Sequence, residues 1–139
     1  MQNYIELSLA LFGEHLVPEG VTEVLKVRPT KAWLRGAIHT TTTNKRILRE
    51  SGLWLFKKRF EGSSFVSLVD QFLDMTNFDF RKKMEIGTIE KVRLGSFISI
   101  RTQDYGSGIC EVFLRSDQLT RLAKIESEIS IDVSFDMDG

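Results

Sequence analysis

Apolar and polar residues alternate with a period of two near both ends of the chain. Residues 4–11 carry Ile or Leu at every second position from Ile5, and residues 128–136 carry Ile, Val and Phe in the same pattern. This period predicts strands that bury one face and expose the other. The second faces hold Glu, Ser and Asp, which disfavours a parallel sheet covered by helices on both sides.

Three further stretches are typical of strands. The run at 52–59 has apolar residues on both faces at its start, which predicts a strand well inside the sheet. Residues 92–101 alternate again, and residues 109–114 follow a turn composition at 104–108, so a strand is expected in each. Residues 37–51 show no sustained period, and we expect a mobile surface loop there.

Helical periodicity is clearest between residues 65 and 73. Apolar side chains recur there at positions i, i+3, i+4, i+7 and i+8, namely Phe65, Leu68, Val69, Phe72 and Leu73. A second helical piece at 78–86, in which Phe80 and Met84 are four residues apart, is expected after a bend at Thr76-Asn77.

Two shorter helices complete the expected set. Pro18 opens a helix over 18–26 that must end before Arg28, because a residue that precedes proline is held in extended geometry. Another helix is expected after a cap at Ser116-Asp117, and its inner face comprises Leu119, Leu122 and Ala123.

The resulting order is strand, helix, strand, helix, strand, strand, helix, strand. We therefore predict an α+β fold, with a predominantly antiparallel sheet of four to five strands and helices packed on one face. A chain of 139 residues is long enough to form one domain over 1–139 with a core of its own.

No window of the sequence resembles a membrane span or a signal peptide. Cys110 is the only cysteine, which excludes an intramolecular disulfide and fits a reducing compartment, so we expect a cytoplasmic protein.

The net charge of zero hides an uneven distribution along the chain. Residues 26–59 hold ten basic residues and one acidic residue, a net charge of +9, whereas residues 102–139 have a net charge of −5. Such asymmetry is typical of a site for an anionic partner, although the two segments could also neutralise each other once the chain has folded.

The basic segment also contains the most distinctive motifs. Residues 20–36 read Gly-Val-Thr-Glu-Val-Leu-Lys-Val-Arg-Pro-Thr-Lys-Ala-Trp-Leu-Arg-Gly, and residues 51–55 read Ser-Gly-Leu-Trp-Leu. With Leu114-Arg115-Ser116-Asp117-Gln118-Leu119 and the acidic strand at 129–133, this pattern resembles a bacterial family described as domain of unknown function 4279. The positions that match are Pro29, Thr30, Trp33, Gly36, Gly52 and Trp54.

The resemblance spans almost the whole chain and implies the family's order of helices and strands. The closing strand departs from it, because Ser134-Phe135-Asp136 stands where the family often has a tyrosine. The family implies no activity. Some small bacterial proteins of this kind are immunity proteins in toxin systems, which is an analogy for function.

Trp33 and Trp54 allow two interpretations. They could form a stacking platform beside Arg28, Lys31 and Arg35, or both could be core side chains with their N–H groups hydrogen-bonded. The flanking apolar residues favour the core for Trp54.

No catalytic or metal-binding set is evident in the sequence. His15 and His39 lack a second ligand at suitable spacing, and Cys110 falls in an expected strand. Asp132 and Asp136 alternate on the outward face of a strand rather than converging on a loop. We expect no metal and no cofactor.

The leading hypothesis is a non-enzymatic protein-binding module for a partner with an acidic surface, such as an acidic toxin. Its partner-binding residues are Arg28, Lys31, Arg35, Lys45, Arg46, Arg49, Lys57 and Lys58. The alternatives are a nucleic-acid-binding domain that uses the basic segment 26–59, and an enzyme whose polar residues converge only in the folded protein. A deep pocket lined by Arg35, His39 or Glu50 would favour the enzyme.

Overall fold

The computed structural model describes residues 3–61, 64–101 and 112–136. Its helices are α1 (Pro18–Leu25), α2 (Phe65–Thr76), α3 (Phe80–Ile86) and α4 (Ser116–Lys124). Its strands are β1 (Tyr4–Gly13), β2 (Lys31–Trp33), β3 (Ile38–Thr40), β4 (Arg46–Leu48), β5 (Gly52–Glu61), β6 (Lys91–Arg101) and β7 (Ser127–Asp136). No described helix is both long and apolar enough to cross a membrane.

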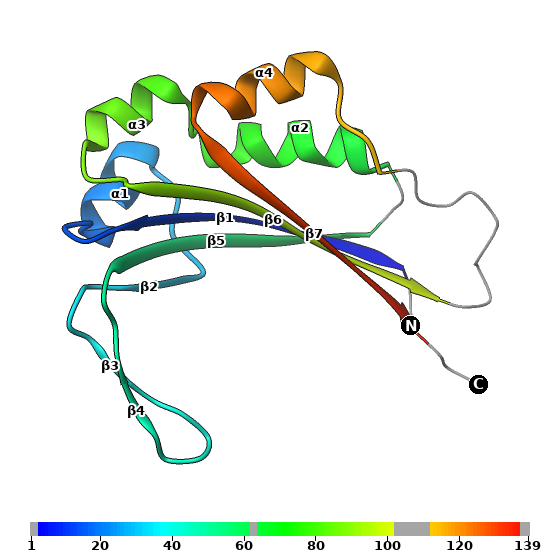
Figure 1. The fold of residues 1–139 in the computed structure, drawn as a ribbon. Helices are drawn as coiled ribbons and strands as arrows, with labels where there is room; N and C mark the ends of the chain where they lie inside the picture. Colours follow the sequence, from blue (N-terminus) through cyan, green and yellow to red (C-terminus); the bar gives the residue numbers. More distant parts are fainter. Residues whose placement is uncertain (1–2, 62–63, 102–111, 137–139) are drawn as a thin grey trace.

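Five strands form one sheet in the order β2-β5-β1-β6-β7. Every neighbouring pair is antiparallel except β6 and β7, which run parallel. The helices lie on one face of this sheet, and a hairpin made of β3 and β4 projects on the opposite side (Figure 1). The predicted α+β fold, with a mostly antiparallel sheet and helices on one face, is confirmed.

The core lies between the sheet and the helices. Ile5, Leu7, Leu9 and Leu11 of β1 are all at most 1% exposed, as the period of two predicts. From α2, the predicted stripe buries Phe65, Val69, Phe72 and Leu73 against them, while Leu68 packs at the margin. Burial of each such side chain stabilises the fold by about 1.5–3 kcal/mol before the entropy cost.

The segment between β2 and β5 differs from the prediction of a mobile loop. Residues 38–48 form an antiparallel hairpin with Ile38 opposite Leu48 and Thr40 opposite Arg46. Asn44 takes a left-handed backbone with φ of 62°, which closes the turn. Both strands are exposed on the surface, so no apolar period marked them in the sequence.

Only the last part of the strand predicted at 109–114 lies within the described residues. These residues, 112–114, lead into α4 and have no strand structure. The inner face of α4 also differs from the prediction, because Leu119 is 48% exposed and Gln118 is 1% exposed. Gln118 is buried as a bridge: its side chain accepts the Arg115 backbone N–H and donates to the Val66 carbonyl oxygen.

Candidate functional site

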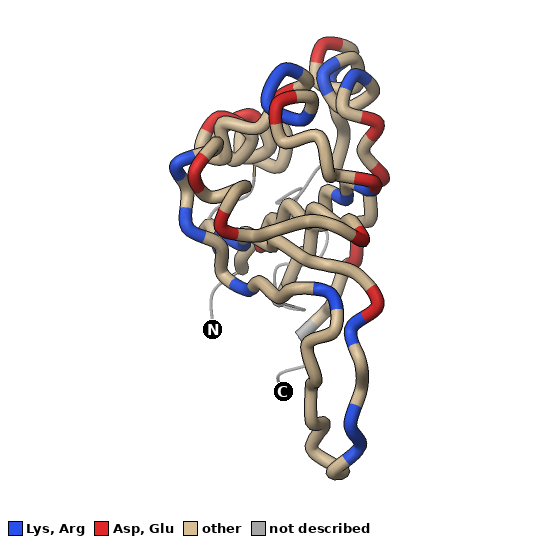
Figure 2. The backbone as a smooth tube through the Cα atoms, turned by 90° about the vertical axis from the view of Figure 1, so that its left-hand side faces the viewer, with Lys and Arg blue, Asp and Glu red and all other residues tan. Residues whose placement is uncertain are grey.

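The eight residues predicted to bind a partner do not form one cluster. Lys45 and Arg46 lie on the hairpin, where Lys and Arg follow one arm (Figure 2). Arg35 pairs with Glu14 at 2.6 Å, and Arg28 lies between α1 and β2. Lys58 faces the helices, because it is opposite buried Leu7 of β1.

The other three predicted residues gather around Trp33 on the open face of the sheet. The Arg49 guanidinium carbon lies 3.8 Å from the centroid of the Trp33 ring, and Lys31 Nζ lies 5.7 Å from it. The Trp33 indole N–H donates to the Ser51 carbonyl oxygen at 3.1 Å. Lys57 and Trp33 line the same hollow. Trp33 therefore joins the base of the hairpin to the edge of the sheet through a cation–π contact.

The two tryptophans have different roles. Trp54 is fully buried, and its N–H donates to Thr22 Oγ1 at 3.1 Å, as expected for a core side chain. Trp33 is only partly buried, yet the Arg49 guanidinium covers its ring. The stacking platform that the sequence left open is thus occupied by the chain's own cation.

The hollow on the open face has a volume of about 410 Å³. Ser8, Gly95 and Ser130 are in register on adjacent strands and form its floor, with Lys57 next in the same row. A Cβ atom at Gly95 would lie 2.6 Å from Ser8 Oγ, so a larger residue there would require the Ser8 hydroxyl group to rotate away. Its lining is mixed, because Trp33, Leu53 and Phe97 contribute apolar surface beside the charged side chains Glu6, Arg93 and Asp132.

Most charges that surround this hollow are already paired. Arg59 lies 3.9 Å from Glu6 across β1 and β5, and Lys91 and Arg93 both lie 3.5 Å from Glu128. These exposed pairs each contribute little to stability. Because these cations are paired, the unpaired positive charge on the open face of the sheet lies toward β2 and the hairpin.

A second hollow, of about 540 Å³, lies between the start of α1 and β2. Its apolar lining includes Val17, Pro18, Ala32 and Leu34, and Glu19 is its acidic residue. Val17 and Leu34 are 52% and 54% exposed. The sequence analysis did not predict this groove, because the groove forms only when α1 packs beside β2. The one sign of it in the sequence is the apolar residue Leu34 among basic neighbours.

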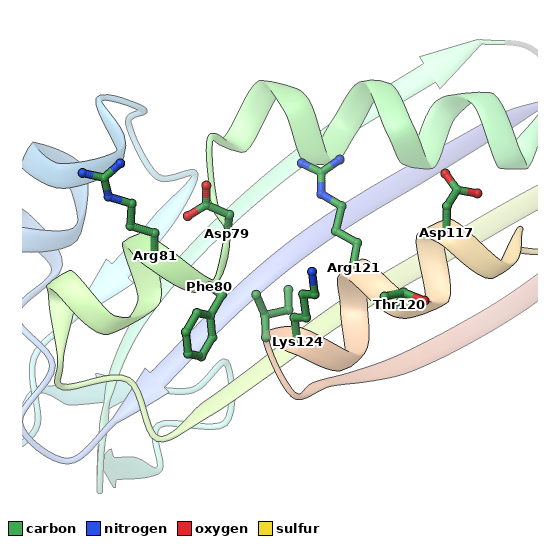
Figure 3. Close-up of a pocket in the computed structure, with 8 residues that line it drawn as sticks. Asp79, Phe80, Arg81, Asp117, Thr120, Arg121 and Lys124 are labelled. Atoms are coloured by element: carbon green, nitrogen blue, oxygen red, sulfur yellow. The ribbon is translucent and has the colours of Figure 1, made fainter.

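A third hollow, of about 680 Å³, lies between α3 and α4 on the helical side (Figure 3). Arg121 extends from α4 toward α2, where it pairs with Asp74 at 3.1 Å. Phe80 of α3 lines the hollow and is 52% exposed, and Met84, four residues further along the helix, is 64% exposed.

A polar network holds α4 on α2. Arg115 pairs with Asp70 and with Asp117, and Gln118 donates to Asp70 at 2.9 Å. The hydrogen bond from Arg115 holds the pKa of Asp70 below its ordinary value, and the same donor lowers the pKa of Asp117. These two carboxylates in turn raise the pKa of Arg115. The network is structural, because its charges satisfy one another.

Within 3–61, 64–101 and 112–136, no three His, Cys, Asp or Glu side chains converge as metal ligands. None of the three hollows above is lined by Arg35, His39 or Glu50.

Comparison with known proteins places the sequence in a family. No curated protein and no solved structure matches the chain. Residues 2–136 match the family described as domain of unknown function 4279, in agreement with the resemblance carried by the Pro-Thr, Trp and Gly motifs. Because the match covers nearly the whole chain, this protein belongs to the domain of unknown function 4279 family.

Proposed function

We propose that this chain is a non-enzymatic protein-binding module that recognises an acidic surface of another protein. The contact is made by the basic hairpin surface, which comprises Lys31, Lys45, Arg46, Arg49 and Lys57. We place this activity in the cytoplasm. An acidic toxin is one suitable partner, by analogy with immunity proteins.

The exposed composition of the hairpin is the observation that carries the proposal. Residues 36–49 contain no acidic residue. Ile38, Ile47 and Leu48 are 57%, 42% and 63% exposed beside Lys45 and Arg46. Exposed apolar side chains next to cations are typical of a protein interface rather than of a solvated loop. Among the described residues, Lys45 and Arg46 form no ion pair.

The nucleic-acid alternative has weaker support. Binding of single strands uses aromatic rings on which bases stack. On the open face, Arg49 covers Trp33 at 3.8 Å and Arg59 covers Tyr4 at 4.0 Å. A base would have to displace a guanidinium group from each ring, whereas an acidic protein could bind the exposed cations directly.

Charge reversal on the hairpin tests this proposal. The variant Lys45→Glu/Arg46→Glu keeps Arg49, because Arg49 packs on Trp33. Its matched control is Arg81→Glu/Lys124→Glu, which reverses two exposed charges at the hollow between α3 and α4. The probes are poly-glutamate and a DNA duplex of random sequence, titrated by fluorescence anisotropy at two salt concentrations.

We expect the hairpin variant to weaken poly-glutamate binding at least tenfold while the control variant binds as the parent does. An equal loss in both variants would mean that net charge, and not the hairpin, determines binding. Tighter binding of the DNA, with affinity that falls steeply as salt rises, would favour the nucleic-acid alternative.

A further inference from the structure

The outer edge of β2 has one backbone position that faces away from the sheet. The Thr30 N–H donates to the Leu55 carbonyl oxygen at 2.7 Å, and the Lys57 N–H donates to Thr30 Oγ1 at 2.9 Å. Residues 55 and 57 of β5 therefore direct their backbone groups toward β2. Since Lys31 is opposite Leu55 and Trp33 is opposite Leu53, these residues bond inward, and Ala32 between them directs its N–H and C=O outward.

The groove between α1 and β2 lies beside this free edge. β2 is the last strand in the sheet order, and Ala32 is opposite buried Trp54, so its side chain is on the helix-covered face. Ala32 lines the groove together with Val17 and Leu34. Lys31 and Trp33 are on the other face, where Arg49 also lies against the Trp33 ring.

We propose that β2 and this groove take up an extended segment of the partner with the pattern acidic, apolar, acidic. The inference rests on the proposed function and specifies its partner. The central residue pairs with Ala32 through two backbone hydrogen bonds, as in other cases of strand addition. Its side chain enters the groove, because residues that are hydrogen-bonded opposite each other share a face.

The charges on the two sides of the β2 edge explain why the proposed partner segment alternates acidic and apolar residues. The two residues that flank the central one face the open side, where Lys31 makes no ion pair among the described residues. An acidic side chain on the helix side would instead meet Glu19 at the rim of the groove. An acidic residue is thus favoured on one face and an apolar residue on the other.

Three short peptides test the pattern. The probe acetyl-Gly-Glu-Leu-Glu-Gly-amide is compared with its isomer acetyl-Gly-Glu-Glu-Leu-Gly-amide and with the analogue that has Lys in place of both Glu residues. Binding is followed by amide chemical shifts of the labelled chain. We expect shifts at Val17, Ala32 and Leu34, and dissociation constants at least fivefold higher for the isomer and the lysine analogue. Equal binding of the two isomers would overturn the proposal.

Two variants separate the groove from the edge. Val17→Asp places a carboxylate in the groove at a half-exposed position, and Met84→Asp is its control on α3. Ala32→Pro removes the outward N–H while Lys31 and Trp33 keep their bonds to β5, a position at which an edge strand tolerates proline. We expect Val17→Asp and Ala32→Pro each to weaken binding of the first peptide at least fivefold and Met84→Asp to leave it unchanged. Each variant should keep the parent's amide spectrum away from β2.

The same variants distinguish this inference from the function on which it rests. If Val17→Asp and Ala32→Pro leave the peptide affinity unchanged while Lys45→Glu/Arg46→Glu still weakens poly-glutamate binding at least tenfold, the docking mode is wrong and the proposed function stands. If Lys45→Glu/Arg46→Glu has no effect on poly-glutamate binding, the proposed function is wrong, and the inference that rests on it is wrong as well. Self-association in sedimentation runs that Val17→Asp abolishes would assign the groove to a second copy of this chain and overturn the proposal of a foreign segment.

Discussion

The two edges of the sheet differ in length, charge and support. The β2 edge has three residues and adjoins the basic hairpin, and its neighbour β5 is joined to α1 by the bond from Trp54 to Thr22. The β7 edge has ten residues, and its described charged side chains are acidic. Ile129, Ile131 and Val133 of β7 are 40%, 42% and 46% exposed, although they are in register with Leu94, Ser96 and Ile98, which are all buried. The same alternation thus yields a core face in β1 and a half-covered face in β7, because an edge strand has a neighbour on one side only.

The largest expected effect concerns the core behind β5, the strand on which the β2 edge is paired. Trp54→Ala removes a fully buried indole and its bond to Thr22, and we expect a loss of about 3–5 kcal/mol in the free energy of unfolding. Chemical denaturation measures it, with Trp54→Phe as the milder control. A loss below about 1 kcal/mol would contradict the view that this edge is anchored by the core.

A smaller effect is expected at the β7 edge. Ile131→Ala removes a side chain that is 42% exposed, so we expect a loss of about 1–2 kcal/mol. Ile98→Ala, in the neighbouring strand at 1% exposure, is the matched comparison and should lie in the range of about 2–5 kcal/mol. Equal losses from the two variants would mean that β7 is as well covered as β6.

The attachment of α4, the helix that precedes β7, to α2 should be sensitive to acid. Folding lowers the pKa of Asp70 from its ordinary 3.8, chiefly through the hydrogen bond from Arg115. Ionised Asp70 therefore stabilises the fold above pH 3.8, and this contribution is lost as the pH falls through the lower folded value.

We expect Asp70→Asn to lower stability at pH 7 by at most about 1 kcal/mol, since the pair is partly exposed, and to flatten the dependence of stability on pH below 3.8. Denaturation curves between pH 2 and 7 measure both effects. An unchanged slope in the acidic range would show that other carboxylates cause the acid sensitivity.

The smallest effect is expected at the junction of hairpin and sheet. Arg49→Ala removes the guanidinium group from the Trp33 ring, a contact worth about 0.5 kcal/mol at an exposed site. Global stability should hardly change, while the fluorescence of Trp33, measured in a Trp54→Phe background, should shift as its ring becomes accessible to quenchers. Unchanged quenching would mean that the hairpin is held by its backbone bonds alone.

Sequence reasoning worked best where one element buries a full face. The β1 alternation and the α2 stripe identified their buried residues because each faces the core along its whole length. It missed β3 and β4, whose exposed strands are stabilised by bonds to each other. It also assigned Leu119 to the inner face of α4, where polar Gln118 is buried by bonds to Val66 and Asp70 that come from a distant helix.

The basic residues that the sequence grouped as partner-binding are separated in the structure. Arg35 is paired with Glu14, and Lys58 lies on the opposite face from Lys57. The apolar groove beside β2 was not predicted, because Val17 and Leu34 are brought together by the packing of α1 and not by any spacing along the chain.

The amino-acid sequence alone determined the α+β class, the main helices and strands, the family and the concentration of positive charge before β5. These depend on local periodicity and composition, which a single chain displays directly. The tertiary structure decided which cations remain unpaired, which tryptophan is buried in the core, and where an apolar groove meets a free strand edge. Those properties depend on contacts between residues far apart in the sequence, and such contacts form only when the sheet and helices pack.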